Sequence, residues 1–480
     1  MKIFTGKQLS EWDRYTIRHE PIASIDLMEL AAGRLADALQ RRVPLCSRLT
    51  FFVGKGNNGG DGLAMARILS NKGFVCRVAL LFPDSLNDNC TVNLSRLPDS
   101  VSVTHDLYCI DSPDEIVVDT ILGSGFVGEA RGKVLEGIHY INSLPNYTVS
   151  IDLPSAMNAE FGNRYADIVH ADFTLTIECP KLAFMLPEAG NACGDVECVG
   201  IGLNDNFRHT AETPFNYSDR DFIDSLLTKK RDKFSHKGNY GHTLLICGSE
   251  GMAGAAFLAT GAALRRQVQE YIPALAAAYP SALTIGEDSD HFDKLPVNID
   301  KYTSLAIGCG LGQHSRTIRA FEQLLDVYRR PMVIDADAIN IISSNTALLG
   351  RIPNNSILTP HIGEFRRLVG QWADEREKIA KARELAEAYS VVVVLKGAYT
   401  MVCLPDGSVW FNSTGNAFMA KAGSGDVLTG LLAGLLARGY TPADAARIGV
   451  YYHGLAGEAA TDAISGESFC SDDIIRFIRI

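Results

Sequence analysis

The stretch AKAGSGDVLTG, residues 420–430, guides the interpretation of the fold. Its small residues, Asp426 and the apolar run after it predict a Gly-rich turn leading into a helix, with Ser424 as the capping residue. Backbone N–H groups at a helix start attract anions, and Gly423 and Gly425 let a phosphate approach closely. An acid there would repel phosphate unless it deprotonates a hydroxyl that attacks the phosphate. The stretch favours phosphoryl transfer; the alternative is an acid that only stabilises a helix N-terminus.

A second Gly-rich stretch, VGKGNNGGDGLAMAR, lies at residues 53–67. A short apolar run before it predicts a buried strand, and a helical pattern follows it. The stretch looks like a dinucleotide fingerprint, but it lacks the G-x-G-x-x-G spacing and a ribose-binding acid at the expected distance. It offers the side chains of Asn57, Asn58 and Asp61 instead.

Composition narrows the class of protein. The 480 residues are 46% hydrophobic and 21% charged with a net charge of −11, as for a globular chain of two or three domains. Without a run of Lys and Arg, we expect neither nucleic acid nor a membrane surface as a partner. Eleven cysteines without a CxxC pair predict no zinc site. No signal peptide or membrane span is recognisable, so we expect a reducing cytoplasm.

Strand and helix patterns alternate along both halves of the chain, which predicts the α/β class with parallel sheets. We expect one domain over 1–210 and a second over 225–480, with a polar, irregular segment around 204–235 between them. The predicted strands lie in the stretches 49–54, 75–82, 115–125, 147–158, 171–181, 195–203, 242–248, 304–312, 331–340, 355–365 and 391–404.

Polar residues follow several predicted strands of the second half, where open α/β sheets bind ligands. They are Asp335 and Asp337 in VIDADAIN, His361 and Glu364 in TPHIGEF, and Lys396 and Thr400 in LKGAYT. Lys396 and Thr400 suit a nucleotide phosphate, and the two aspartates suit a metal or a positioned water. Each motif alone also fits a structural histidine, a solvated acid or an ordinary strand-end lysine.

The first half shows the same pattern. Asp119, Asp152 and Ser155 follow predicted strands, and Asn58 lies in the Gly-rich stretch. An acid, a side-chain carbonyl and a hydroxyl that converge suit a hard, weakly charged cation. The alternative is that Asn58 and Asp119 only cap turns.

The ordered motifs HKGNYG, GMAGAA, GCGLG, DADAIN, TPHIGEF, LKGAYT, GSGDVLTG and YYHGLAGEAA resemble the ADP-dependent NAD(P)H-hydrate dehydratase family over residues 225–480. The resemblance implies a ribokinase-like fold with ADP as co-substrate and Mg²⁺. A nucleotide would phosphorylate the hydroxyl of (S)-hydrated NADH or NADPH, and loss of phosphate would restore the nicotinamide double bond. It implies Asp426 as the base, Gly425 beside the nucleotide phosphate, Lys396, Gly397, Ala398, Tyr399 and Thr400 around the nucleotide, and Ala255, Gly310, His361 and Asp426 around the hydrated nicotinamide.

The motifs GNNGGDGLAMAR, DTILGSGFVGEARG, IDLPSAMN and CPKLAFMLPEAG resemble the NAD(P)H-hydrate epimerase family over residues 1–205, which implies a Rossmann-like three-layer sandwich. The resemblance implies K⁺ held by Asn58, Asp119 and Ser155, and acid–base work by Asp152 at the epimerised carbon. The implied substrate contacts are Asn57, Asn58, Gly59, Gly60, Asp61, Gly123, Ser124, Gly125, Phe126, Val127, Gly128, Glu129 and Asp152. The fused order is that of bifunctional bacterial-type repair enzymes, and we expect a homo-oligomer.

Three departures from these families stand out. Ala156 replaces the glycine of the usual PSG motif, and Cys309 replaces the proline of the usual GPGLG motif. Residues 262–284 lack the Gly-rich turn and apolar strand that the family places there.

Two other functions remain: a ribokinase-like small-molecule kinase fused to a Rossmann-like module, or a catalytically silent nucleotide-binding protein. The HKGNYG and HIGEF motifs disfavour the kinase, and intact Asp426, Asp152, Asn58 and Asp119 disfavour the silent protein.

Overall fold

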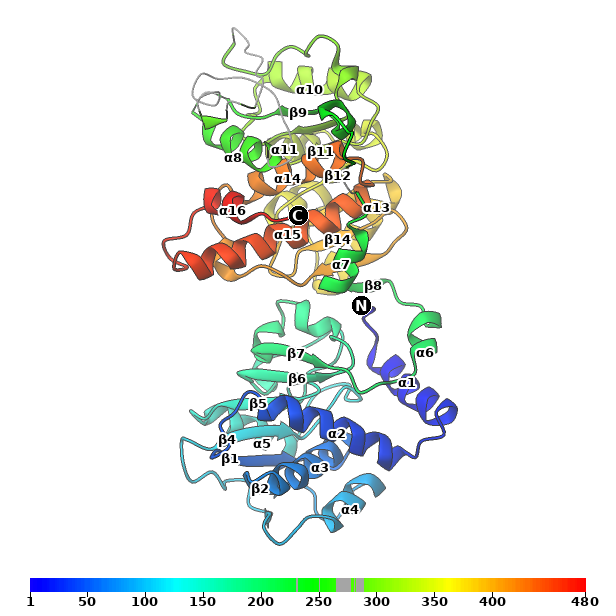
Figure 1. Cartoon of the computed structure of the whole chain (residues 1–480), viewed down its shortest axis with the longest axis vertical. Coiled ribbons are helices and arrows are strands. Elements are labelled where there is room, and N and C mark those ends of the chain that lie inside the picture. The colour runs from blue at the N-terminus through cyan, green and yellow to red at the C-terminus, as the bar shows by residue number, and fades with distance from the viewer. Residues whose placement is uncertain (230–231, 250, 265–277, 280, 282–288) are drawn as a thin grey trace. The chain divides into compact units, whose positions relative to one another are not determined.

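The computed structural model describes the whole chain except residues 230–231, 250, 265–277, 280 and 282–288. The chain divides into two compact units, one of Lys2–Thr213 and one of Pro214–Ile480 together with Met1 (Figure 1). The sequence predicts that a family strand is missing around residues 262–284, and most of that stretch lies outside the described residues. In the described part of the chain, no helix has both the length and the apolar character that a membrane crossing requires.

The sheet of the first unit has seven strands, all parallel, in the order β3-β2-β1-β4-β5-β6-β7. The strands are β1 (Arg48–Val53), β2 (Val75–Leu80), β3 (Ser102–Thr104), β4 (Ile116–Thr120), β5 (Thr148–Ile151), β6 (Phe173–Ile177) and β7 (Asp195–Val199). The strand order reverses between β1 and β4, and such a reversal opens a crevice at the carboxyl ends of the strands. The parallel α/β arrangement predicted from the sequence is confirmed.

Helices cover both faces of this sheet and complete three layers. The helices of this unit are α1 (Gly6–His19), α2 (Ser24–Gln40), α3 (Asn57–Asn71), α4 (Asp88–Ser95), α5 (Lys133–Ser143) and α6 (Asp205–Thr210). On one face Phe51 packs in a core with Leu35 of α2 and Leu63 of α3. On the other face Phe52 packs with Ile138 of α5. Successive strand residues point to opposite faces, so an unbroken apolar run serves both cores.

The sheet of the second unit has eight described strands in the order β8-β15-β14-β13-β12-β11-β10-β9. They are β8 (Phe215–Ser218), β9 (Thr243–Ile246), β10 (Ser304–Ile307), β11 (Val333–Ile334), β12 (Ile357–Leu358), β13 (Val392–Leu395), β14 (Met401–Cys403) and β15 (Val409–Asn412). The neighbours from β9 to β13 are parallel, whereas β14 is antiparallel to both β13 and β15. The stretch 391–404 is therefore two strands joined by a turn.

The polar segment around 204–235, expected to be irregular, contains regular elements. Strand β8 pairs in parallel with β15, and the short helix α7 (Arg220–Leu226) follows it. The prediction was wrong because β8 lies at a sheet edge and is only partly buried, so it carries no continuous apolar run.

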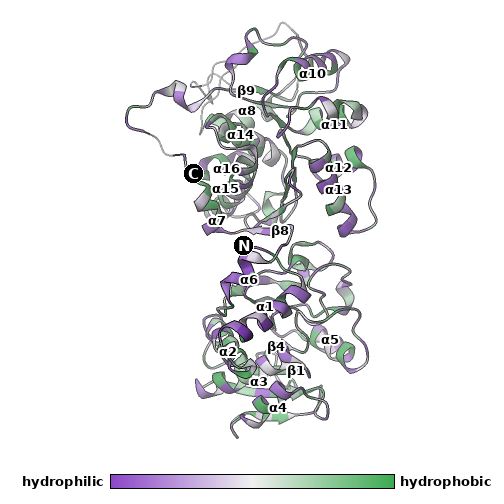
Figure 2. Ribbon diagram, turned by 90° about the vertical axis from the view of Figure 1, so that its right-hand side faces the viewer, coloured by the Kyte–Doolittle hydropathy of each residue, from purple (hydrophilic) through white to green (hydrophobic). Residues whose placement is uncertain are grey.

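Two helical layers enclose the second sheet (Figure 2). Helices α8, α14, α15 and α16 lie on one face, and α10, α11, α12 and α13 lie on the other. Their bounds are α8 (Ala253–Leu264), α10 (Ser315–Val327), α11 (Ala336–Ser344), α12 (Ile362–Val369), α13 (Glu375–Ala388), α14 (Ser424–Ala437), α15 (Pro442–Ala463) and α16 (Ser471–Phe477). A Cβ at Gly430 would lie 2.0 Å from the carbonyl oxygen of Ala259, so α14 packs closely on α8. This buried packing fixes the N-terminus of α14.

Two candidate active sites

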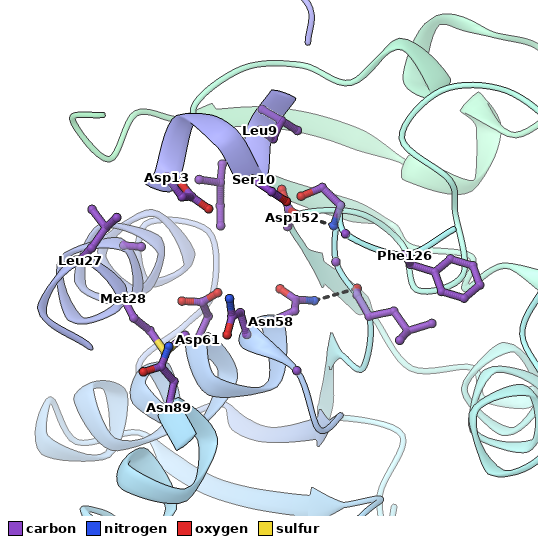
Figure 3. Close-up of a pocket in the computed structure, with 18 of the residues that line it drawn as sticks. Leu9, Ser10, Asp13, Leu27, Met28, Asn58, Asp61, Asn89, Phe126 and Asp152 are labelled. Atoms are coloured by element: carbon purple, nitrogen blue, oxygen red, sulfur yellow. Dashed lines mark hydrogen bonds between the residues drawn. The ribbon is translucent and has the colours of Figure 1, made fainter. Parts of the chain in front are cut away.

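The first unit contains a cavity of about 840 Å³ at the carboxyl ends of β1, β4 and β5 (Figure 3). Helices α1 and α2, the start of α4 and the segments that follow β6 and β7 contribute its remaining walls. Of the residues predicted to contact substrate, those that line the cavity are Asn57, Asn58, Asp61, Gly123, Ser124, Gly125, Phe126, Val127 and Asp152. The structure therefore brings together residues that are up to ninety-five positions apart in the sequence.

Four predicted contact residues are not in the cavity lining. A Cβ at Gly59 would lie 2.1 Å from the carbonyl oxygen of Gly54, and a Cβ at Gly60 would lie 2.7 Å from the sulfur of Met28. These two glycines allow α3 to pack closely at its N-terminus. Gly128 is exposed at a positive φ of 106°, and exposed Glu129 forms an ion pair of 3.5 Å with Arg164.

A buried ion pair holds the carboxylate of Asp152. Lys181 Nζ lies 2.9 Å from Asp152 Oδ1, and the backbone N–H of Ser124 donates to Asp152 Oδ2 over 2.8 Å. Burial alone would raise the pKa of Asp152, but the Lys181 ammonium and the Ser124 hydrogen bond outweigh it and hold this pKa below its usual value. Asp152 is therefore ionised at neutral pH.

Two further carboxyl groups face the same cavity. Burial, and then the charges of Asp152 and Asp13, raise the pKa of Asp61 well above its usual value. Loss of hydration by the surrounding protein and, after it, the negative charge of Asp152 raise the pKa of Asp13, on α1, to about 6. One cavity thus contains three carboxyl groups whose pKa values differ: that of Asp152 is lowered, that of Asp13 is raised to about 6 and that of Asp61 is raised well above its usual value (Figure 3).

The predicted cation ligands meet beneath this cavity. Ser155 Oγ donates to Asp119 Oδ1 over 2.5 Å, and Asn58 Nδ2 donates to the carbonyl oxygen of Leu122 over 2.8 Å. The backbone N–H of Leu122 in turn donates to Ser155 Oγ over 2.8 Å. Asn58 Oδ1 is buried without a hydrogen-bond partner. Since a buried amide oxygen ordinarily has a partner, this atom is a candidate ligand for a cation.

Ala156 takes the left-handed conformation with φ of 69° in the turn after Ser155. A glycine adopts this conformation without the steric cost that a Cβ brings. The turn therefore keeps the backbone shape that suits the glycine of the related PSG motif, in spite of the substitution.

In the second unit, Asp426 lies in the first turn of α14 beside a buried ion pair. Lys396 Nζ lies 2.9 Å from Asp335 Oδ1, and Thr429 Oγ1 donates to Asp335 Oδ2 over 2.8 Å. Burial raises the pKa of Asp426, an effect that the Cys309 thiol opposes by hydrogen bonding and that the charge of Asp335 reinforces. The Cys309 sulfur and one carboxylate oxygen each of Asp335 and Asp426 lie within 4.8 Å of one another. Buried Asp335 is thus no solvated loop acid.

Gly425 lies directly over this ion pair. A Cβ added to it would lie 3.1 Å from Lys396 Nζ and 3.8 Å from Asp335 Oδ2. Gly397 and Ala398 are exposed in the turn after β13, which closes through a 3.0 Å hydrogen bond from Thr400 Oγ1 to the carbonyl oxygen of Gly397. The predicted nucleotide residues therefore meet around one exposed turn and one helix N-terminus.

Of the predicted nicotinamide residues of this unit, Ala255 lies in the first turn of α8, whereas Gly310 follows β10 and His361 follows β12. A Cβ at Gly310 would lie 3.1 Å from the Cβ of Ala255, so the two residues are in contact range. His361 forms a parallel bridge with Lys396, and its Nδ1 accepts from the N–H of Gly363 over 2.9 Å. Its ring is 54% exposed, so it caps α12 and remains accessible.

One local expectation is wrong. Ser424 is not the capping residue of α14, because the helix already begins there and Gly423 is its N-cap, with φ of 89°. The Ser424 carbonyl oxygen instead lies 2.9 Å from His453 Nε2 on α15. The pKa of His453 is lowered to about 4, chiefly by burial, so its ring is neutral near pH 7.

The sequence interpretation did not single out Lys181 or Asp13 as functional residues. Lys181 occurs within an apolar stretch, CPKLAFM, and a lysine in such a stretch is a signal for a buried partner. Asp13 occurs in an amphipathic helical pattern with many charges, which carries no comparable signal. Only the position of α1 over the cavity distinguishes Asp13.

Comparison with known proteins finds a separate family match in each of the two units. Residues 243–479 match the model of the NAD(P)H-hydrate dehydratase family, and residues 24–183 match that of the YjeF-related protein N-terminus. The bifunctional NAD(P)H-hydrate repair enzyme Nnr of Moorella thermoacetica is 33% identical over 100% of this chain and 96% of its own length. The enzyme of the same name from Coxiella burnetii is 29% identical over 100% and 99%.

Among solved structures, an ADP/ATP-dependent NAD(P)H-hydrate dehydratase from Bacillus subtilis, co-crystallised with ATP/Mg²⁺, is similar to the second unit. It is 31% identical, covers 55% of this chain and 96% of its own, and has a TM-score of 0.46.

The fold and the sites define an enzyme of two α/β units, each with a cluster of carboxyl groups near the carboxyl ends of its strands. The chain belongs to the family of bifunctional NAD(P)H-hydrate repair enzymes. The predicted family, enzyme class and α/β fold class are confirmed.

Proposed function

We propose that the first unit interconverts the R and S epimers of hydrated NADH and NADPH, and that the second dehydrates the S epimer with ADP, giving AMP and phosphate. The observation that carries the proposal is Asp426, placed in a helix N-terminus beside Lys396 and Asp335. Together these groups supply a base and a cation where a phosphate would bind.

In the dehydratase step, Asp426 accepts the proton of the substrate hydroxyl as this oxygen attacks the terminal phosphate of the nucleotide. Its raised pKa makes it a better base than an exposed aspartate. Lys396 and the N–H groups at the start of α14 stabilise the charge on the transferred phosphoryl group. Because Gly425 has no side chain, it leaves room for that phosphoryl group.

Gly397, Ala398, Tyr399 and Thr400 would hold the rest of the nucleotide, whereas Ala255, Gly310 and His361 would hold the hydrated nicotinamide. Mg²⁺ would accompany the nucleotide and neutralise part of its phosphate charge. ADP is proposed over ATP as co-substrate on the basis of the bifunctional family, and equal use of the two would contradict it.

In the epimerase unit, we assign a K⁺ site to Asn58, Asp119 and Ser155. The unpartnered Asn58 Oδ1 supports this assignment, and the three side chains offer only oxygen ligands. Bound K⁺ would fix the loops that carry Leu122 and Ser155. Asp152 acts beside the epimerised carbon in its ionised form, because Lys181 holds it charged.

The activity test gives the protein R-hydrated NADH with ADP, Mg²⁺ and K⁺, and follows the recovery of reduced-nicotinamide absorbance. Recovery faster than spontaneous epimerisation shows both activities. If only the S epimer is repaired, the epimerase proposal is wrong. If neither is repaired, the silent nucleotide-binding alternative replaces the proposal, and phosphorylation of another small molecule would favour the kinase. The expected homo-oligomer is checked by sedimentation on the same sample.

A further inference from the structure

The cavity of the first unit has a carboxyl group that none of the assigned roles uses. Asp13 lies on α1, lines the cavity and points into the same space as Asp61 and Asp152 (Figure 3). In the described part of the chain, no hydrogen bond or ion pair holds its carboxyl group. An acid placed in a cavity wall without a structural partner is available to a ligand.

The assigned acid–base residue cannot serve as a proton donor. Asp152 is ionised, with one oxygen on Lys181 and the other on the N–H of Ser124. Such a carboxylate accepts a proton or stabilises a cation, but it has no proton to give at neutral pH. An epimerisation that breaks a carbon–oxygen bond needs an acid as well, because hydroxide is a poor leaving group.

Two neighbouring groups could supply the proton, and their environments separate them. Asp61 is buried, and its burial raises its pKa well above the usual value, which makes it the weaker acid of the two. Asp13 is exposed to the cavity and has a pKa of about 6. A group that titrates near the working pH is the better acid–base catalyst, because it both releases and regains its proton.

All charged groups that face Asp13 fit this behaviour. The negative charges of Asp152, at the end of β5, and Glu178, at the end of β6, favour the protonated form of Asp13. Asp61 of α3 faces the same cavity, and its pKa is in turn raised by Asp13. The positive charges of Lys181 and of Arg14, the residue after Asp13 on α1, favour the ionised form of Asp13. They do not outweigh the effects of burial and of the nearby carboxylates. The balance leaves Asp13 able to exist in both states near neutral pH.

We propose that Asp13 is the catalytic acid of the epimerase unit, acting with ionised Asp152 on the hydrated nicotinamide. This inference rests on the proposed epimerase function. The hydroxyl of the hydrate is on a ring carbon bonded to the ring nitrogen, so departure of the hydroxyl is assisted by the nitrogen lone pair.

The step balances as follows. The Asp13 proton moves to the hydroxyl oxygen, the carbon–oxygen bond breaks with its electron pair on the departing water, and the nitrogen lone pair forms a carbon–nitrogen double bond. Water then adds to the other face of the cationic carbon and gives its extra proton to Asp152. Transfer of that proton to Asp13 through cavity water restores both groups.

The test compares wild type, Asp13→Asn and Asp13→Glu in the full chain, with Glu11→Gln as the matched control. Glu11 lies on the same helix, outside the cavity lining, in an exposed ion pair with Lys7. Repair of the R epimer reports the epimerase, provided that the dehydratase is in excess. Repair of the S epimer by the same sample reports the second unit and the integrity of the chain.

For Asp13→Asn we expect kcat for R-epimer repair to fall at least about 100-fold while KM stays within about threefold. Asp13→Glu should recover part of the rate, and Glu11→Gln should match wild type. Wild-type epimerase kcat/KM should fall as the pH rises through about 6, since Asp13 loses its proton there, and Asp13→Asn should lack this limb.

Full R-epimer repair by Asp13→Asn, or an unchanged pH limb in that variant, would overturn the inference and leave the proposed function standing. A wild type that does not accelerate R-epimer repair would overturn both. Should Asp13→Asn also lose S-epimer repair through misfolding, the pH limb of wild type and its shift in Asp13→Glu decide the matter, and a flat wild-type profile contradicts the role.

Discussion

The ammonium of Lys181 lies 2.9 Å from the carboxylate of Asp152, and both side chains are buried, with 1% and 9% of their surface exposed. Lys181 also donates to Thr176 Oγ1 over 2.8 Å and to the carbonyl oxygen of Ile177 over 2.7 Å. This pair joins the ends of β5 and β6 at the cavity. A buried charge whose partner is removed is costly, because water does not replace the lost interaction.

The first prediction concerns this pair. Lys181→Met should destabilise the first unit by about 3–5 kcal/mol, since it leaves Asp152 charged and unpaired, and should reduce R-epimer repair. Urea unfolding measures the first effect. Lys72→Met, which breaks an exposed pair with Asp37, should cost no more than about 1 kcal/mol. An equal loss in the two variants would contradict a special role for the buried pair.

The pH dependence of the pair has a definite sign. The pKa of Asp152 is lower in the folded protein than in the unfolded chain, so its contribution to stability is present above the usual aspartate pKa of 3.8. That contribution is lost as the pH falls through the folded-state pKa. Asp152→Asn should therefore flatten the acid limb of the unfolding free energy of this unit.

The second prediction concerns the proposed base of the dehydratase. Asp426→Asn should lower S-epimer turnover by at least about 100-fold, because the amide cannot accept the hydroxyl proton. Nucleotide affinity, measured by calorimetry with ADP and Mg²⁺, should persist. Asp462→Asn, at an exposed site on α15, is the control and should behave as wild type. Retained turnover in Asp426→Asn would exclude this residue as the base.

The third prediction concerns the cation. K⁺ should raise the midpoint of thermal unfolding of the first unit by a few degrees relative to Li⁺, since binding to the folded state stabilises it by about 2.7 kcal/mol at 100 times Kd. Asn58→Ala should abolish that difference, whereas Asn71→Ala, at the exposed end of the same helix, should keep it. Equal midpoints in K⁺ and Li⁺ for wild type would remove the K⁺ assignment.

The fourth prediction concerns His453. Its pKa of about 4 in the folded state is below its usual value of 6.5, so the unfolded chain binds the proton more readily. The contribution of neutral His453 to the free energy of unfolding is fully present above pH 6.5. It falls by roughly 3 kcal/mol as the pH drops to 4. Urea unfolding of the second unit at several pH values measures this slope. His453→Gln should reduce it, whereas His242→Gln, at an exposed position, should leave it unchanged.

The strand ends were predictable because their signal is local. A buried parallel strand is a short apolar run that ends near a polar residue, so Asp119 and Asp152 could be named from the sequence. Asn58 and Asp426 could be named because each lies in a Gly-rich stretch that leads into a helix. Strand β8 could not be found in this way, since an edge strand is half exposed and needs no apolar run.

By itself, the sequence determined the α/β class, the family and the residue types available to each site, because apolar periodicity and motif order are properties of the chain alone. Only the tertiary structure decided the state of those residues. It buried Lys181 against Asp152, placed Asp13 of α1 over a distant cavity and left Asn58 Oδ1 without a partner. Charge state and availability depend on which groups surround a side chain, and packing sets those neighbours across long separations in the chain.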